Sequence, residues 1–149
     1  VPAVYFNSLF GTSNDEQKYI ITGNNRDVNR YKWNKKNILN LLKNKASKQS
    51  NFYNAITKLL NIRKKQKAFH PNSSRTNINL GSKIFCFKRI SLDKKQIIIS
   101  ITNLTSNCQF AKLNGRYIMW KNLINPNLKI IKKKSLKLKP FETMWLTNT

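Results

Sequence analysis

The sequence predicts an α+β chain in which helical segments come first and an antiparallel β domain follows. Three observations support this fold class: an apolar run at residues 1–6, apolar residues three or four positions apart between residues 38 and 60, and apolar–polar alternation after residue 71. The chain has 149 residues, of which 40% are hydrophobic, which is enough to build a core. We therefore expect a folded protein.

The chain opens with "VPAVYF" and has no initiating methionine. A short continuous apolar run of this kind is typical of a strand that is buried on both faces of a parallel sheet. A free protein seldom begins inside such a core. We therefore expect this chain to be the C-terminal piece of a longer protein.

A polar stretch from Gly11 to Lys32 follows, with no usable periodicity, and is predicted to be a long loop of the kind that is usually functional or disordered. Two helices come next. Ile38, Leu41 and Leu42 share one face of the first, and Ser50 is the expected N-cap of the second. The apolar face of the second helix is predicted to hold Phe52, Ala55, Ile56, Leu59 and Leu60.

Beyond residue 71 the apolar period changes from 3.6 to 2, which predicts a sandwich or curled sheet of about seven or eight antiparallel strands. "LNGRY" at residues 113–117 is the clearest hairpin. A domain boundary near Pro71 is predicted, dividing residues 1–70 from an all-β domain at 71–149. The strand-like runs are "TNINL", "KIFCFKRIS", "QIIISITNL", "CQFAKL", "RYIMW", "LKIIKK", "SLKLK" and "TMWLT".

The chain is strongly basic, with 29 Lys and Arg against five Asp and Glu and a net charge of +24. A charge of this size is typical of proteins that bind nucleic acid. The basic residues are spread along the whole chain and accompany abundant Asn and Ile, which is the mixture expected of an A+T-rich coding sequence. We therefore expect binding of nucleic acid only non-specifically, through net charge.

Metal and membrane sites are not expected. Cys86 and Cys108 lack a CxxC spacing and are predicted to be buried thiols of a reducing compartment, while the single histidine, His70, is predicted to be structural. No signal peptide or membrane-spanning run is recognisable, so the predicted location is cytoplasmic and no membrane partner is expected. No cofactor is predicted.

Four stretches together resemble a known family: "VPAVYFNSLFGTSND", "TGNNRDVNRYKW", "LLNIRKKQKAFHP" and "SLKLKPFETMWL". In this order they are similar to the last portion of the α-amylase superfamily, glycoside hydrolase family thirteen. Within it they most resemble the sucrose phosphorylase subgroup, whose members act on sucrose, sucrose phosphate or glucosylglycerate. The resemblance is firmest over the first 70 residues.

The resemblance implies a fold and an activity. Residues 1–70 would supply the last strand, loop and helices of a (β/α)8 barrel, followed by the antiparallel β-sandwich of a C-terminal domain. The longer protein would be a retaining α-glucosyl phosphorylase that uses inorganic phosphate to release glucose 1-phosphate from sucrose or a related glucoside. Its partners would be a small sugar and phosphate.

The resemblance also implies binding residues. Loops after barrel strands form the active-site face, and Arg26 matches an arginine beside the acceptor subsite, so it is expected to contact phosphate or the leaving sugar acid. Arg30 and Asn29 are further substrate-binding candidates, and Asn14 and Asp15 resemble a stretch on the acceptor side. No residue of this chain is predicted to be catalytic.

Structural alternatives stay open for these residues. Arg26 and Asp27 could form an ion pair that braces the loop, and Arg30 could stack on Tyr31 or Trp33. An Asn-Asp pair such as that at residues 14 and 15 makes turns more often than it binds sugars.

The acidic residues do not supply a retaining mechanism, which needs two carboxylates about 5 Å apart. No persuasive pair exists among Asp15, Glu16, Asp27, Asp93 and Glu142. We therefore expect the catalytic carboxylates to lie outside this chain and the chain alone to be inactive. Two alternatives remain: a hydrolytic α-amylase-family glycosidase, and, from another class, a basic β-domain protein that binds nucleic acid through aromatics such as Trp120 and Phe110.

Overall fold

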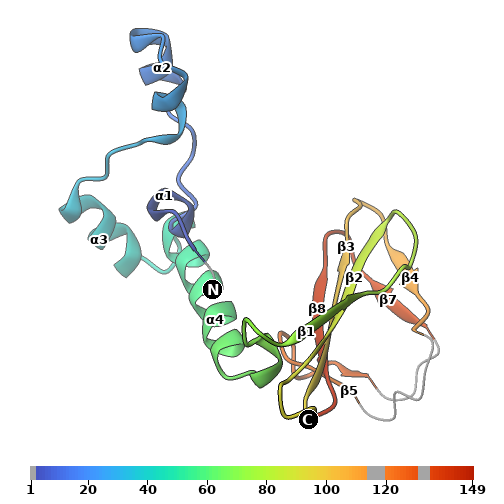
Figure 1. The fold of residues 1–149 in the computed structure, drawn as a ribbon. Coiled ribbons are helices and arrows are strands. Elements are labelled where there is room, and N and C mark those ends of the chain that lie inside the picture. The colour runs from blue at the N-terminus through green and yellow to red at the C-terminus, as the bar shows by residue number, and fades with distance from the viewer. Residues whose placement is uncertain (1–2, 114–119, 131–134) are drawn as a thin grey trace. The chain divides into compact units, whose positions relative to one another are not determined.

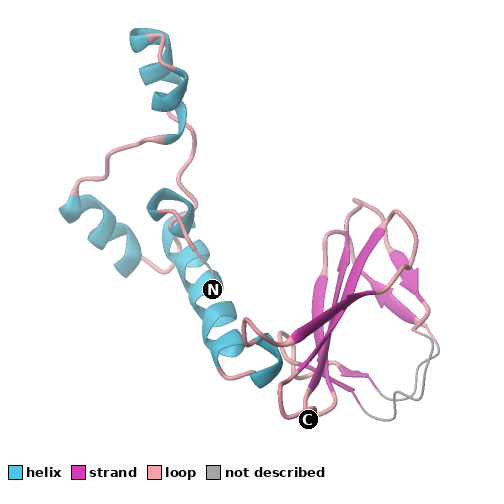
Figure 2. Cartoon of the chain, in the orientation of Figure 1, coloured by secondary structure: helices cyan, strands magenta, loops and turns pink. Residues whose placement is uncertain are grey.

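The computed structural model describes residues 3–113, 120–130 and 135–149. The chain divides into two compact units, Val1–Asn61 and Ile62–Thr149. The first unit is helical and the second consists mainly of antiparallel strands, as Figure 2 shows by colour. The predicted α+β fold class with antiparallel sheets is therefore confirmed.

The helical unit contains four α-helices and one short 3₁₀-helix among its described residues (Figure 1). The last α-helix crosses the division between the two units. The elements are α1 (Phe6–Leu9), α2 (Glu16–Thr22), η1 (Asn25–Asn29), α3 (Lys35–Lys43) and α4 (Lys48–Lys64).

The strand predicted at residues 1–6 is not formed over the part of it that the structure describes, residues 3–6. Residues 3–5 have no regular secondary structure, and α1 begins at Phe6. The physical reason is the lack of neighbouring strands: a strand is stabilised by hydrogen bonds to a partner strand, and the described part of the helical unit holds none. An apolar run without such partners is free to take up a helical turn.

The stretch predicted as one long loop, Gly11 to Lys32, instead contains α2 and η1. The Asp15 carboxylate accepts a hydrogen bond from the Lys18 backbone nitrogen at 3.1 Å and caps α2, and Gly23 ends it at a φ of 63°. The periodicity rule missed α2 because this helix has no buried face: Ile20 and Ile21 are 78% and 82% exposed.

The third and fourth helices follow the predicted pattern only in part. Ile38 of α3 is buried as expected. Ser50 is not the cap of α4, because the helix begins at Lys48 and the Ser47 hydroxyl accepts the backbone N–H of Ser50 at 3.0 Å. On the predicted apolar face of α4, Ile56, Leu59 and Leu60 are half-buried, whereas Phe52 and Ala55 are exposed. Tyr53, which was not predicted, stacks on Phe10 with ring centroids 5.7 Å apart.

The β unit contains two antiparallel sheets, with strand orders β1-β2-β3-β8-β5-β6 and β4-β7. A short 3₁₀-helix, η2 (Lys67–Phe69), precedes them. Each predicted run corresponds to one strand, whereas the predicted hairpin at 113–117 falls largely outside the described residues. The strands are β1 (Ser74–Asn77), β2 (Ile84–Ile90), β3 (Ile97–Asn103), β4 (Gln109–Ala111), β5 (Trp120–Asn122), β6 (Lys129–Ile130), β7 (Leu136–Leu138) and β8 (Thr143–Thr147).

One apolar core joins the two sheets. Antiparallel register places Cys86 opposite Ile101 and Ile101 opposite Met144, so alternate residues of β2, β3 and β8 share one face. Leu136 and Leu138 of the smaller sheet belong to the same buried cluster. The alternation in the sequence therefore records which residues enter this core.

A smaller cluster covers the opposite face of the larger sheet. Phe69 packs edge-on against Trp145, with ring centroids 4.9 Å apart, and joins Ala68 and Ile98 in a buried group. The guanidinium of Arg63 lies 4.7 Å from the centre of the Phe69 ring. The segment before β1 is thereby packed onto the β unit.

The two cysteines differ in exposure. Cys86 is buried, and burial raises its pKa to about 11. Cys108 was predicted to be buried and is exposed, because it precedes the short strand β4 rather than lying inside a strand. Among the described residues, no helix combines the length and apolar character required to span a membrane.

Candidate functional site

The candidate site is built on the turn formed by η1. The Asn24 side chain accepts a hydrogen bond from the Arg26 backbone nitrogen at 3.0 Å and so starts the turn. At the other end, the backbone N–H of Asp15 donates to the Val28 carbonyl at 2.7 Å. These contacts bind the turn to the segment that precedes α2.

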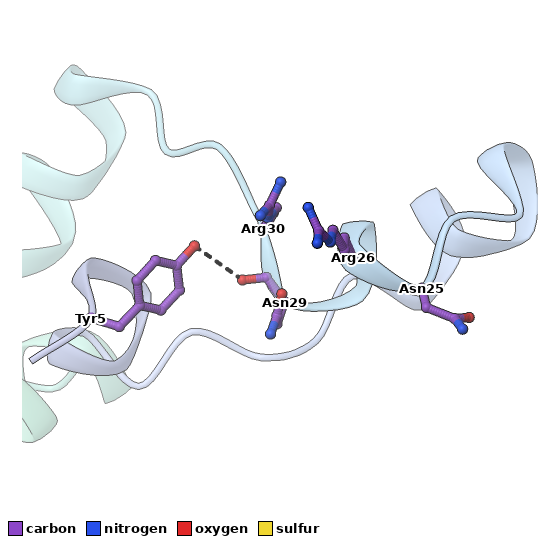
Figure 3. Close-up of a pocket in the computed structure, with 5 residues that line it drawn as sticks. All are labelled: Tyr5, Asn25, Arg26, Asn29 and Arg30. Carbon is purple, nitrogen blue, oxygen red and sulfur yellow. Dashed lines mark hydrogen bonds between the residues drawn. The ribbon is translucent and has the colours of Figure 1, made fainter.

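The turn carries an open pocket of about 410 Å³, shown in Figure 3. The Tyr5 ring lies on the other side of the pocket, and its hydroxyl donates to the Asn29 carbonyl at 3.4 Å. Three of the five predicted binding residues meet here. The lining residues are Tyr5, Asn25, Arg26, Asn29 and Arg30.

The guanidinium groups of the two pocket arginines are available to a ligand. Among the described residues, neither the Arg26 nor the Arg30 guanidinium has a hydrogen-bonded or ion-paired partner. The alternative brace between Arg26 and Asp27 is not what the structure holds, because Asp27 pairs with Lys18 at 3.2 Å. Two guanidinium groups without carboxylate partners are suited to bind an anion.

Asp27 is held in its ionised form. The Thr22 hydroxyl and the Lys18 ammonium lower its pKa, and the charge of Arg30 acts in the same direction. The alternative in which Arg30 stacks on Tyr31 or Trp33 is not found among the described residues. The rings of Tyr31 and Trp33 instead make an edge contact with each other, with centroids 4.9 Å apart.

Asn14 and Asp15 lie at a second pocket, of about 230 Å³, and do not join the arginines. Asp15 is the N-cap of α2. The indole nitrogen of Trp33 donates to the Thr12 hydroxyl at 2.9 Å across this second pocket. The geometry therefore separates the five predicted residues into two groups.

Sequence reasoning missed three residues of the first pocket and its support: Tyr5, Asn25 and Asn7. Tyr5 was assigned to a buried strand, and Asn25 fell within the predicted long loop without being singled out. Asn7 is 7% exposed, and its side-chain amide donates to the carbonyls of Asn29 and Tyr31 at 3.3 and 3.0 Å. These contacts span more than 20 residues, and no local pattern signals them.

Four of the five acidic side chains, those of Asp15, Asp27, Asp93 and Glu142, are engaged in local hydrogen bonds or ion pairs. Asp93 accepts from the Ser91 hydroxyl at 2.6 Å and pairs with Lys67 at 2.9 Å, and Glu142 accepts the Lys139 backbone N–H at 2.8 Å. A general acid needs a raised pKa, whereas the Ser91 hydroxyl, Lys67 and the Lys95 amide lower that of Asp93. The described residues contain no cluster of three or more His, Cys, Asp or Glu that could hold a metal.

Curated relatives support a sugar phosphorylase. The chain is 27% identical over 149 residues to a glucosylglycerate phosphorylase of Escherichia coli, covering 98% of this chain and 25% of that protein. It is 36% identical over 73 residues to the protein of the same name from Allomeiothermus silvanus, covering 49% of this chain and 13% of that one. The chain resembles the C-terminal region of an α-amylase-family sugar phosphorylase. This confirms the resemblance inferred from the sequence.

This chain spans about a quarter of the length of the Escherichia coli relative. A third relative, the glucosylglycerate phosphorylase of Spirochaeta thermophila, is 26% identical over 113 residues, covering 74% of this chain and 19% of that protein. No protein-family profile matches the sequence.

Solved structures support the fold. AmyP in complex with maltose superposes with a TM-score of 0.58 at 18% identity, covering 67% of this chain and 21% of that one. The trehalulose synthase MutB gives a TM-score of 0.57 at 18% identity, covering 73% of this chain and 19% of that one. The fold therefore matches part of these enzymes.

Proposed function

We propose that the protein to which this chain belongs is a phosphorylase of glucosylglycerate, releasing glucose 1-phosphate and glycerate. The observation that carries the proposal is the match of nearly the whole chain to a glucosylglycerate phosphorylase. The activity would follow the retaining mechanism, in which a carboxylate attacks the anomeric carbon and phosphate then displaces it. Inorganic phosphate would be the second substrate.

The chemistry of the pocket favours an anionic leaving group over a neutral one. Glycerate and phosphate both carry negative charge, and each must occupy the acceptor side in turn. Arg26 and Arg30 offer two guanidinium groups without carboxylate partners among the described residues, in one pocket with Asn29. We assign these three residues to acceptor binding. Sucrose, whose leaving group is neutral fructose, uses this charge in only one half of the cycle.

Asn14 and Asp15 remain weaker binding candidates. They line the second pocket beside Trp33 and Gln49. The Asp15 carboxylate accepts the Lys18 amide as a helix cap. We propose that these residues form the outer wall of the acceptor side and support substrate indirectly.

The remaining parts of the proposal concern the longer protein. We propose that residues 1–70 close a (β/α)8 barrel, that residues 71–149 form its C-terminal β domain, and that the protein is cytoplasmic. The nucleophile and the acid/base would lie outside this chain, because four of its five acidic side chains cap a helix or pair locally and leave no pair of free carboxylates. We therefore expect no turnover by the 149-residue chain alone.

The test is a product assay on the complete protein with glucosylglycerate and with sucrose, each with and without inorganic phosphate. We expect phosphate-dependent release of glucose 1-phosphate, faster from glucosylglycerate. Release of free glucose at the same rate with and without phosphate would instead establish a hydrolase.

The same preparation tests the competing class of function. A basic protein of this net charge binds nucleic acid with a steep salt dependence whatever its role. A preference for base or strand type that survives about 0.2 M salt, together with no glucoside turnover, would overturn the phosphorylase proposal.

A further inference from the structure

We propose that Asn7 is the positioning residue of the acceptor pocket, holding the arginine-bearing turn in its binding conformation. This inference rests on the proposed function, because it assigns Asn7 a role in binding the anionic acceptor. Asn7 lies in α1, 22 residues before the nearer carbonyl that it contacts.

The amide of Asn7 uses both of its N–H donors on the turn. They reach the carbonyl of Asn29 at 3.3 Å and that of Tyr31 at 3.0 Å. These carbonyls lie on either side of Arg30. The backbone position from which the Arg30 side chain leaves is therefore fixed by one buried side chain.

Two further donors act on the same stretch of backbone. The Asp15 N–H bonds the Val28 carbonyl at 2.7 Å, and the Tyr5 hydroxyl reaches the Asn29 carbonyl at 3.4 Å. The Tyr5 contact is long and exposed, so it contributes little. Asn7 is the buried member of this set, at 7% exposure, and its hydrogen bonds are the better shielded from water.

The surroundings of residue 7 favour a side chain that donates hydrogen bonds over an apolar one. Within the part of the chain that the structure describes, the buried Oδ1 of Asn7 has no hydrogen-bond partner. A buried acceptor of this kind carries a desolvation cost that an apolar side chain would avoid. The asparagine is therefore explained by its N–H groups and by its neutrality, which adds no carboxylate beside the two arginines.

The consequence for binding is preorganisation. An anion that meets a turn already in its binding conformation does not have to order that turn, and the ordering cost otherwise weakens affinity. Loss of the Asn7 donors should therefore raise the KM for phosphate more than it lowers kcat. A residue that only stabilised the fold would not produce that split.

The test compares Asn7→Ala and Asn7→Asp in the complete protein with a matched control, Asn103→Ala. Asn103 is a buried asparagine of the β unit whose amide donates to the carbonyls of Asn107 and Lys139 at 2.7 and 2.8 Å. The loss of two amide-to-carbonyl hydrogen bonds is thus common to both positions, and Asn103→Ala additionally removes the acceptor of the Thr105 N–H and hydroxyl. All variants are assayed at a temperature well below their unfolding transitions.

We expect Asn7→Ala to raise the KM for phosphate about tenfold. Asn7→Asp should raise it further, since an ionised carboxylate would face two carbonyl oxygens. This isosteric variant also tests the inference if the alanine variant folds poorly. Its defect should shrink at lower pH, because a protonated carboxyl donates one hydrogen bond. Asn103→Ala should keep the KM within about twofold of the wild type, although it lowers thermal stability.

A second readout does not depend on activity: amide hydrogen exchange at Arg26, Asp27 and Arg30. We expect faster exchange at these amides in Asn7→Ala and unchanged exchange in Asn103→Ala. Unchanged exchange in Asn7→Ala would overturn the inference that Asn7 holds the turn in place. Faster exchange with an unchanged KM would overturn the role of Asn7 in binding. If the wild-type protein lacks phosphorolysis, the proposed function fails. The exchange result would still support or overturn the positioning of the turn by Asn7.

Discussion

The two compact units of the chain are stabilised by different kinds of contact. In the β unit, a continuous apolar core joins both sheets and includes Ile99, Ile101 and Leu138, each 0% exposed. Among the described residues of the helical unit, two of the four buried side chains are polar: Asn7 and Ser50. The helical unit therefore depends more on directional hydrogen bonds, which fix the geometry of a turn but contribute less free energy than a core.

One buried asparagine from each unit, Asn103 and Asn7, illustrates this difference. Asn103 uses its whole side chain: the amide donates to two carbonyls, and Oδ1 accepts from the Thr105 backbone N–H at 2.9 Å and hydroxyl at 2.8 Å. Asn7 uses only its donors, with Oδ1 unpartnered among the described residues. A fully satisfied asparagine belongs to a stable fold, whereas a partly satisfied one marks a position kept for another reason.

The largest expected effect is the loss of stability when one leucine side chain is truncated in each unit. Leu138→Ala removes a fully buried side chain of β7 and should lower the free energy of unfolding by about 2–5 kcal/mol. Leu39→Ala in α3, where the side chain is 47% exposed, should cost less than about 0.5 kcal/mol. Urea unfolding followed by circular dichroism measures both. Equal losses would refute the difference in burial between these two side chains.

A smaller effect tests packing inside the helical unit. Gly11 and Gly23 both have positive φ, at 57° and 63°, but a Cβ on Gly11 would lie 2.8 Å from Cγ of Phe52, while nothing lies within 4 Å of one on Gly23. Gly23→Ala should cost about 1 kcal/mol from backbone strain alone, and Gly11→Ala about 1–3 kcal/mol more because Phe52 must move. Thermal unfolding measures the difference. Similar costs would mean that Phe52 moves freely.

The smallest effect concerns how the stability of each unit falls at acidic pH. The pKa of Asp93 is lowered by the Ser91 hydroxyl and Lys67, and that of Asp27 by the Thr22 hydroxyl and Lys18. A lowered folded-state pKa gives stability that is present above the unfolded pKa, about 4, and is lost as pH falls through the folded value.

The Asp93→Asn and Asp27→Asn variants test this loss of stability at acidic pH. Each should be less stable than the wild type at pH 5–7, by a difference that shrinks below about pH 4. Melting temperatures between pH 2 and 7 check this for both variants. A difference that grows towards low pH would contradict the assigned direction of the pKa shift.

The β unit was the more predictable from sequence, because alternation follows burial directly. Ile99 and Ile101 point into the core while Ser100 between them does not, and each predicted run overlaps one strand of the described residues. The helical unit was less predictable. The predicted strand at residues 1–6 depended on partner strands, and α2 has no buried face, although Asp15 and Gly23 are recognisable caps.

The candidate site was predictable only where a local motif existed. Arg26, Asn29 and Arg30 lie within five consecutive residues, so the sequence could suggest that they act together. Their separation from Asn14 and Asp15 follows from the hydrogen bonds that orient the turn. Asn7 could not be found, because its role depends on carbonyls 22 and 24 residues away.

The most direct test of anion binding by Arg26 is the KM for phosphate of Arg26→Ala in the complete protein, measured beside that of Arg75→Ala. Both arginines are exposed, but Arg75 lies on β1, with its guanidinium 4.8 Å from the centre of the Phe87 ring. We predict that Arg26→Ala raises the KM for phosphate by about tenfold or more and that Arg75→Ala leaves it within about twofold. If the two variants behave alike, Arg26 is not a ligand of the anionic acceptor and the central assignment is wrong.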